Sequence, residues 1–87
     1  MEPCAVYQSD SQATYSYGVM ERSAALRLIV DLARQTVAEF EAEGWPCLIN
    51  RAEGQPGTKY LASLRIFSDW HDMQMFWVER AENHESL

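Results

Sequence analysis

The sequence of 87 residues predicts an α+β fold: a two-layer sandwich in which two helices cover one face of an antiparallel sheet. Three observations predict it. Segments with period two indicate strands, a long segment with period 3.6 indicates one helix, and a capped aromatic segment near the C-terminus indicates a second. The expected order is (β)βαββα, with residues 1–87 forming a single domain.

Two strands are expected before the first helix. Residues 4–8 have the length of a short strand, and residues 9–12 form a polar, turn-like break. From Ala13 to Met20, the bulkier side chains of Tyr15, Tyr17 and Val19 alternate with small or polar ones, which is typical of a strand. The first strand either pairs with the second as a hairpin or forms a loose tail.

The segment Glu21 to Glu43 is predicted to be the first helix, with Ser23 as its cap. Gly44 is expected to end it, and Pro46 prevents its continuation. Its apolar positions repeat with the spacing of a single helical face: Leu26, Ile29, Val30, Ala33, Val37 and Phe40.

A β-hairpin is predicted next, with strands over residues 47–52 and 58–67 and a Gly- and Pro-rich turn over 53–57. Cys47 and Ile49 are expected on one face of the first strand, with Leu48 on the other. In the second strand, alternation predicts one face with Tyr60, Ala62, Leu64 and Ile66, and the other with Leu61, Ser63, Arg65 and Phe67.

The last predicted element is a helix from Trp70 to about Asn83, capped by Ser68 and Asp69. Trp70, Met73, Trp77 and Ala81 would share one of its faces. Both helices would then lie on the same side of the sheet.

Composition excludes several classes of protein. An apolar fraction of 47% with 23% charged residues is typical of a globular domain, and ten aromatic residues argue against disorder. No apolar run has the length of a transmembrane helix, and the first ten residues lack the features of a signal peptide. Two cysteines are too few for a disulfide scaffold, so we expect a cytoplasmic protein.

The net charge of −6 bears on partners. Nucleic-acid binding depends on clustered basic residues, and the seven here are spread along the sequence, so no direct nucleic-acid binding is expected. The acidic excess favours solubility, or an acidic surface that meets a protein partner with a basic patch.

Catalytic and metal-binding motifs are missing from the sequence: there is no HExxH, CxxC, GxGxxG or P-loop. We therefore expect no metal and no cofactor. His71, flanked by Asp69 and Asp72, is the best single candidate for acid–base chemistry, because nearby carboxylates raise the pKa of a histidine. Arg65 is a second weak candidate, as a group that polarises a substrate.

The aromatic residues are numerous for so small a core. Since each large aromatic side chain buries roughly 150–250 Å², some are expected outside the core, in an interface or a ligand pocket. The candidates for this role are Trp45, Tyr60, Phe67, Trp70 and Trp77. The face of the predicted hairpin that bears Phe67 and Leu48 needs a second layer, and a symmetric homodimer would provide it.

A family resemblance covers residues 41–77. An acidic residue and glycine after a long helix, a Cys-Leu strand, a Pro-Gly turn and a Ser-led segment occur here as Glu43-Gly44, Cys47-Leu48, Pro56-Gly57 and Ser68. This arrangement resembles the antibiotic-biosynthesis-monooxygenase-like group of dimeric α+β barrels. The resemblance implies a ferredoxin-like fold, with two protomers packed sheet to sheet and a cleft between sheet and helices.

Three functions are compatible with the sequence. The first is a non-enzymatic, homodimeric protein-interaction domain. The second is a small dimeric enzyme acting on a planar aromatic substrate in a cleft lined by Tyr60, Trp70 and Trp77, with His71 or Arg65 polarising it. The third is an acidic inhibitor of a basic or nucleic-acid-binding partner.

Overall fold

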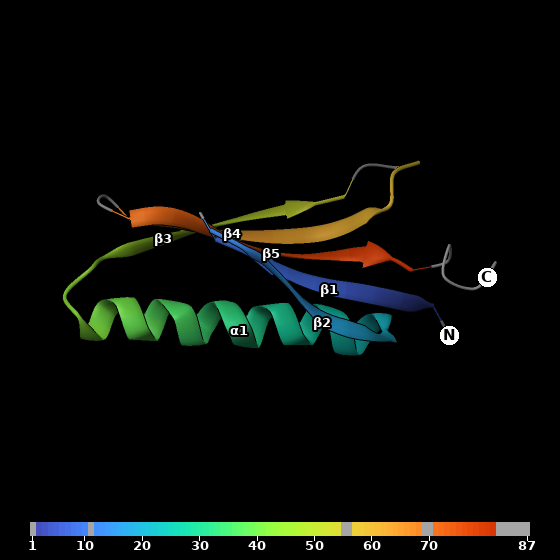
Figure 1. Cartoon of the computed structure of the whole chain (residues 1–87), viewed down its shortest axis with the longest axis horizontal. Helices are drawn as coiled ribbons and strands as arrows, with labels where there is room; N and C mark the ends of the chain where they lie inside the picture. Colours follow the sequence, from blue (N-terminus) through green and yellow to red (C-terminus); the bar gives the residue numbers. More distant parts are fainter. Residues whose placement is uncertain (1, 11, 55–56, 69–70, 82–87) are drawn as a thin grey trace.

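The computed structural model describes residues 2–10, 12–54, 57–68 and 71–81, and shows one long helix lying against one face of a five-stranded sheet (Figure 1). The elements follow in the order β1 (Pro3–Ser9), β2 (Thr14–Glu21), α1 (Arg22–Ala42), β3 (Cys47–Glu53), β4 (Tyr60–Ser68) and β5 (His71–Arg80). The class is therefore α+β, as the sequence predicts.

All strand pairs are antiparallel, and the spatial order is β2-β1-β5-β4-β3. The hairpins β1–β2, β3–β4 and β4–β5 join neighbours in sequence. The remaining pair, β1 with β5, joins the two ends of the chain, with Val6 opposite Val78 and Tyr7 opposite Trp77. The last strand of the chain thus occupies the centre of the sheet, and β1 is a paired strand with a neighbour on each side.

The predicted ferredoxin-like sandwich with two helices is wrong. The segment expected to form the second helix contains β5, so α1 is the only helix among the described residues. The expected cap at Asp69, the start of that helix at Trp70 and its end beyond Ala81 lie outside them.

A physical reason for this error lies in the sequence around Phe76. Aromatic and β-branched residues favour strands, and the run from Met75 to Val78 is continuously apolar. In β5, Phe76 and Val78 face α1, whereas Met75 and Trp77 are apolar on the other face, so the strand shows a continuous apolar run instead of alternation. Short apolar runs fit either a strand or a buried helix, and here pairing with β1 and β4 makes the segment a strand.

The helix α1 is close to its predicted range. Its cap is Glu21 and not Ser23: the Glu21 carboxylate accepts hydrogen bonds from the backbone N–H groups of Ser23 and Ala24 and from the Ser23 hydroxyl. Hydrogen bonds from Ser23, through its side chain and its backbone, lower the pKa of Glu21. Gly44, with φ of 87°, ends the helix as predicted, because this left-handed conformation favours glycine.

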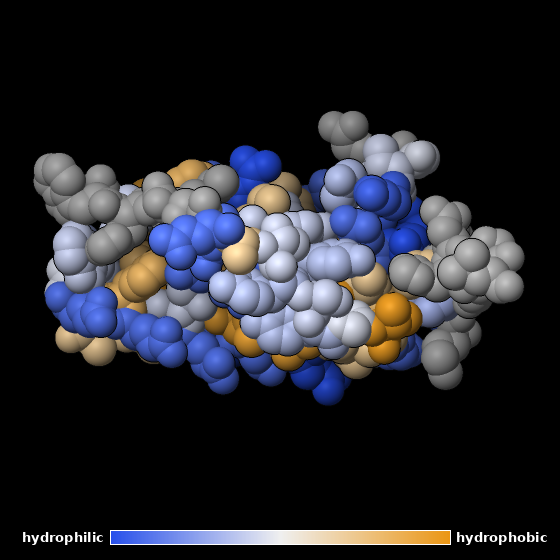
Figure 2. Space-filling model, viewed as in Figure 1, coloured by the Kyte–Doolittle hydropathy of each residue, from blue (hydrophilic) through white to orange (hydrophobic). Residues whose placement is uncertain are grey.

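The core lies between α1 and the facing side of the three central strands. Ala25, Ile29 and Ala33 are the buried residues of the helix. Phe76, Ile66, Val6, Val78 and Cys4 are the largest fully buried side chains. The outer side of α1 is hydrophilic, and Figure 2 shows blue residues along the lower edge, where the helix lies.

Two β-bulges change which face a side chain occupies. Between Ala5 and Tyr7 the register with β2 shifts, and Gly18 in the bulge has φ of 91°. Val19 consequently lies opposite Ala5, on the other side of the sheet from Tyr15. A second shift, between Tyr60 and Ala62, separates Tyr60 from the core side that Ala62, Leu64 and Ile66 share, so the predicted common face is wrong at Tyr60.

Candidate interaction surface

The face of the sheet opposite α1 is not covered by any described element, and we call it the open face. Its residues follow from the pairing, because directly opposed residues in antiparallel strands lie on the same face. Tyr7 and Trp77 are paired in its centre, and Arg65 lies opposite Met75. The open face comprises Pro3, Ala5, Tyr7, Ser9, Thr14, Ser16, Val19, Glu21, Leu48, Asn50, Ala52, Tyr60, Ser63, Arg65, Phe67, Met75, Trp77 and Glu79.

An aromatic pair occupies the middle of the open face. The rings of Tyr7 and Trp77 are stacked, with centroids 5.4 Å apart and an angle of 26° between their planes. The indole Nε1 of Trp77 donates a hydrogen bond to Oε2 of Glu79 at 2.8 Å. Because its polar group is already satisfied, the remainder of the Trp77 ring presents apolar surface.

Polar contacts extend from this pair to the edge of β4. Glu79 forms an ion pair with Lys59, with Oε1 and Nζ 3.6 Å apart, and the Lys59 ammonium lies 5.5 Å from the centre of the Tyr60 ring. The carboxylate of Glu79 is only 15% exposed, so its charge is partly shielded and locally compensated. This end of the open face therefore carries little net charge.

Beside Trp77 the open face is hollowed. A shallow cavity of about 340 Å³ is lined by residues of β3, β4 and β5, among them Ser63, Arg65, Met75 and Trp77. Towards the β3 edge, Leu48 is 74% exposed and lies opposite Phe67, and these two residues border a second hollow of about 300 Å³. Large apolar side chains thus reach from the centre of the face to its edge.

Four of the predicted site residues come together on this face: Tyr60, Arg65, Phe67 and Trp77. Trp45 does not join them. It lies between α1 and β3, where its backbone N–H donates to the Phe40 carbonyl at 2.9 Å.

The two remaining candidates are not tested. Trp70 lies outside the described residues, and His71 is described only by its backbone, opposite Ser68. Of the residues expected in a cleft between sheet and helices, Trp77 lies on the open face, away from α1, whereas Tyr60 also lines a cavity that Arg22 and Leu26 of α1 border.

Sequence reasoning missed Tyr7, Met75 and Val19 as parts of the surface. Tyr7 belongs to the first strand, for which the sequence does not decide between a hairpin and a loose tail. Met75 falls within the segment for which the sequence predicts a second helix. The signal that identifies Tyr7 is alternation within residues 3–9, where Tyr7 differs in parity from Cys4 and Val6.

Both cysteine thiols have a raised pKa. Burial, followed by the charge of Glu2, raises the pKa of Cys4, and burial, followed by the charge of Glu41, raises that of Cys47. Both cysteines are free. A raised pKa keeps a thiol protonated at neutral pH, which makes it a weak nucleophile. Among the described residues, no group of three His, Cys, Asp or Glu side chains is placed to hold a metal ion.

The described part of the chain has no helix with the length and apolar character that crossing a membrane requires. Comparisons with protein-family models, with curated proteins and with solved structures gave no match to this chain.

Proposed function

We propose that this chain is a protein-interaction domain that forms a homodimer through the open face of its sheet. The observation that carries the proposal is the Tyr7–Trp77 stack in the middle of an uncovered sheet face. Tyrosine and tryptophan are enriched among the residues that contribute most to binding, and these cluster near the centres of interfaces.

The size of the open face fits such an interface. Five strands spaced about 4.8 Å apart give a width of about 24 Å, and strands of seven to ten residues are roughly 23–33 Å long. The product is on the order of 550–800 Å². A stable interface of ordinary size buries roughly 600–1,000 Å² on each partner, so the area of the face overlaps the lower part of this range.

The charge distribution also favours self-association through this face. A dimer of chains with a net charge of −6 needs a contact surface that is depleted in acidic residues. On the three central strands, the described open-face side chains with a charge are Arg65 and Glu79, one of each sign. The acidic excess lies elsewhere, for instance at Asp31, Glu39 and Glu41 on exposed positions of α1.

The test is the mass in solution, measured by light scattering during size-exclusion chromatography. A mass near twice 10.0 kDa is expected for the unmodified chain. Trp77→Lys places a charge in the centre of the face and is expected to give the monomer mass. Tyr15→Lys is the matched control: Tyr15 is 51% exposed and lies opposite Gln8, on the other face, so its variant should remain dimeric.

A second variant keeps the proposal testable if Trp77→Lys fails to fold. Leu48 is 74% exposed, so Leu48→Lys should leave the protomer folded and shift the dimer towards monomer. A mass of 10.0 kDa for the unmodified chain at every concentration, or dimers that all three variants leave intact, would overturn the proposal. The planar aromatic substrate and the basic partner expected from the sequence stay predictions.

A further inference from the structure

A second surface lies on the opposite side of the sheet, between α1 and strands β3 and β4. A cavity of about 410 Å³ there is lined by three arginines from three elements: Arg22 of α1, Arg51 of β3 and Arg80 of β5. An adjoining cavity of about 240 Å³ shares Leu26, Arg51 and Ala62 with the first. Because the two cavities share these lining residues they adjoin, and we call them together the arginine groove.

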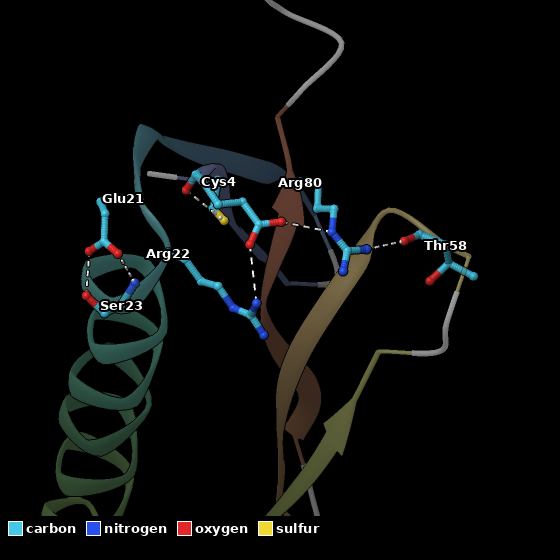
Figure 3. Close-up of polar contacts among 7 residues, drawn as sticks. Cys4, Glu21, Arg22, Ser23, Thr58 and Arg80 are labelled. Atoms are coloured by element: carbon cyan, nitrogen blue, oxygen red, sulfur yellow. Dashed lines mark hydrogen bonds and ion pairs between the residues drawn. The ribbon is translucent and has the colours of Figure 1, made fainter.

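The charged end of the groove is held in place by ion pairs. The Glu2 carboxylate forms two ion pairs (Figure 3). Its Oε1 lies 3.2 Å from Nη1 of Arg22, and its Oε2 lies 3.0 Å from Nε of Arg80. Arg80 also donates through Nη1 to the Thr58 carbonyl at 2.8 Å. Figure 3 shows the Arg22 side chain extending from the start of α1 towards the strands. These contacts fix two guanidinium groups at the mouth of the groove.

Arg51 differs from the other two arginines. Its side chain has no hydrogen bond or ion pair with the described part of the chain, although it borders both cavities. Two carboxylates lie at the arginine end of the groove: Glu2 pairs with Arg22 and Arg80, and Glu53 lines the cavity. The three arginines and these two carboxylates together carry one net positive charge. In a chain with a net charge of −6, a locally positive groove is distinctive, and it suits one singly charged anion.

The other end of the groove is apolar. Leu26, Ile29 and Val30 of α1 and Leu64 of β4 line it, with Arg27 at its rim. From Arg22 to Val30 the helix rises about 12 Å. A ligand that fills the groove therefore needs an anionic head at the arginines and an extended apolar tail along the helix.

We infer that the arginine groove binds a small amphipathic carboxylate of the fatty-acid type. Its carboxylate meets Arg51, and its alkyl chain lies between α1 and strands β3 and β4. A guanidinium group presents N–H donors in a plane that matches a carboxylate. This inference does not rest on the proposed homodimer, because Arg51 and the lining residues of α1 lie on the helix side of the sheet, although Tyr60 borders both surfaces.

The probe for the test is decanoate, with binding measured by calorimetry and located by amide chemical-shift changes. We expect amide chemical-shift changes in α1 between Leu26 and Val30, because α1 borders the groove and lies on the side of the sheet opposite the open face. Arg51→Gln should weaken binding about tenfold, as loss of a charge-assisted hydrogen bond does. Arg34→Gln is the matched control, because it removes one exposed positive charge of α1 outside the lining of the groove.

Two further ligands separate the contributions of head and tail. Butyrate shares the head and lacks the tail, and decylamine shares the tail and reverses the head charge, so both should bind at least tenfold more weakly than decanoate. The inference is overturned if decanoate does not bind, if decylamine binds equally well, or if Arg51→Gln and Arg34→Gln weaken binding alike. Shifts confined to the sheet, without any in α1, would also overturn it.

Discussion

The most decisive single perturbation of the fold is Phe76→Ala. Phe76 is 1% exposed and belongs to β5, the central strand, between Gln8 of β1 and Leu64 of β4. It is also the largest of the fully buried side chains. Truncation to alanine removes its apolar contacts and leaves a cavity that neighbouring strands fill only partly.

The expected loss is about 3–5 kcal/mol of unfolding free energy, the range for removing a buried phenylalanine ring. A domain of 87 residues has a total stability of about 4–13 kcal/mol. The variant therefore loses a large part of its stability, and Tm should fall by at least about 12 °C. If the segment formed the predicted helix, Phe76 would lie beside the apolar face that contains Trp77. Phe76→Ala would then lower the unfolding free energy by less.

Urea unfolding followed by circular dichroism, at one fixed protein concentration, measures this loss. Phe67→Ala is the matched control, since Phe67 is a half-buried phenylalanine of the neighbouring strand on the open face. It should cost clearly less than Phe76→Ala. A loss below about 1 kcal/mol for Phe76→Ala, or equal losses for both variants, would refute the placement of β5 in the centre of the core.

Three further predictions concern other parts of the molecule. A double-mutant cycle of Tyr7→Ala and Trp77→Ala in urea unfolding should give a coupling of about 0.5–1.5 kcal/mol, and additive losses would contradict the stack. Glu21 has a lowered pKa in the folded state, so its stabilisation is complete above the unfolded-state pKa and is lost as the pH falls through the folded-state value. The stability difference between the unmodified chain and Glu21→Gln should therefore shrink on acidification, and a constant difference would argue against the carboxylate cap. Gly44→Ala should destabilise by about 1 kcal/mol because of the positive φ, and an unchanged Tm would contradict that conformation.

The first part of the fold can be read from local patterns. The apolar repeat from Leu26 to Phe40 predicts α1, and Gly44 marks its end because few other residues adopt its conformation. The β3–β4 hairpin follows from alternation on both sides of a Gly- and Pro-rich turn. These signals are local, so the sequence alone carries them.

The last strand and the composition of the open face depend on contacts that local patterns do not contain. The segment around Trp77 fits a helix by spacing, and its pairing with β4 and with β1, some seventy residues earlier, makes it a strand. The two bulges move Val19 and Tyr60 to faces that simple alternation does not predict. Trp77, Phe67 and Tyr60 were recognised as surface candidates by residue type, and Tyr7 was not.

The arginine groove is a second feature that local sequence patterns do not predict. Its arginines are spread along the sequence, which led to the expectation that basic residues are not clustered. Folding brings Arg22, Arg51 and Arg80 to one groove because α1, β3 and β5 meet there. Spacing in the sequence reveals clusters of residues within a single helix or strand. The arginine cluster combines residues from three elements, so spacing does not reveal it.

The most direct test of the central claim identifies the face through which two protomers meet. A sample that mixes isotope-labelled and unlabelled chains, studied by isotope-filtered NOE spectroscopy, reports only contacts between protomers. We predict intermolecular NOEs from the side chains of Tyr7, Trp77 and Met75 on the open face. Intermolecular contacts that involve α1 alone, or no intermolecular NOEs at millimolar concentration, would contradict the account.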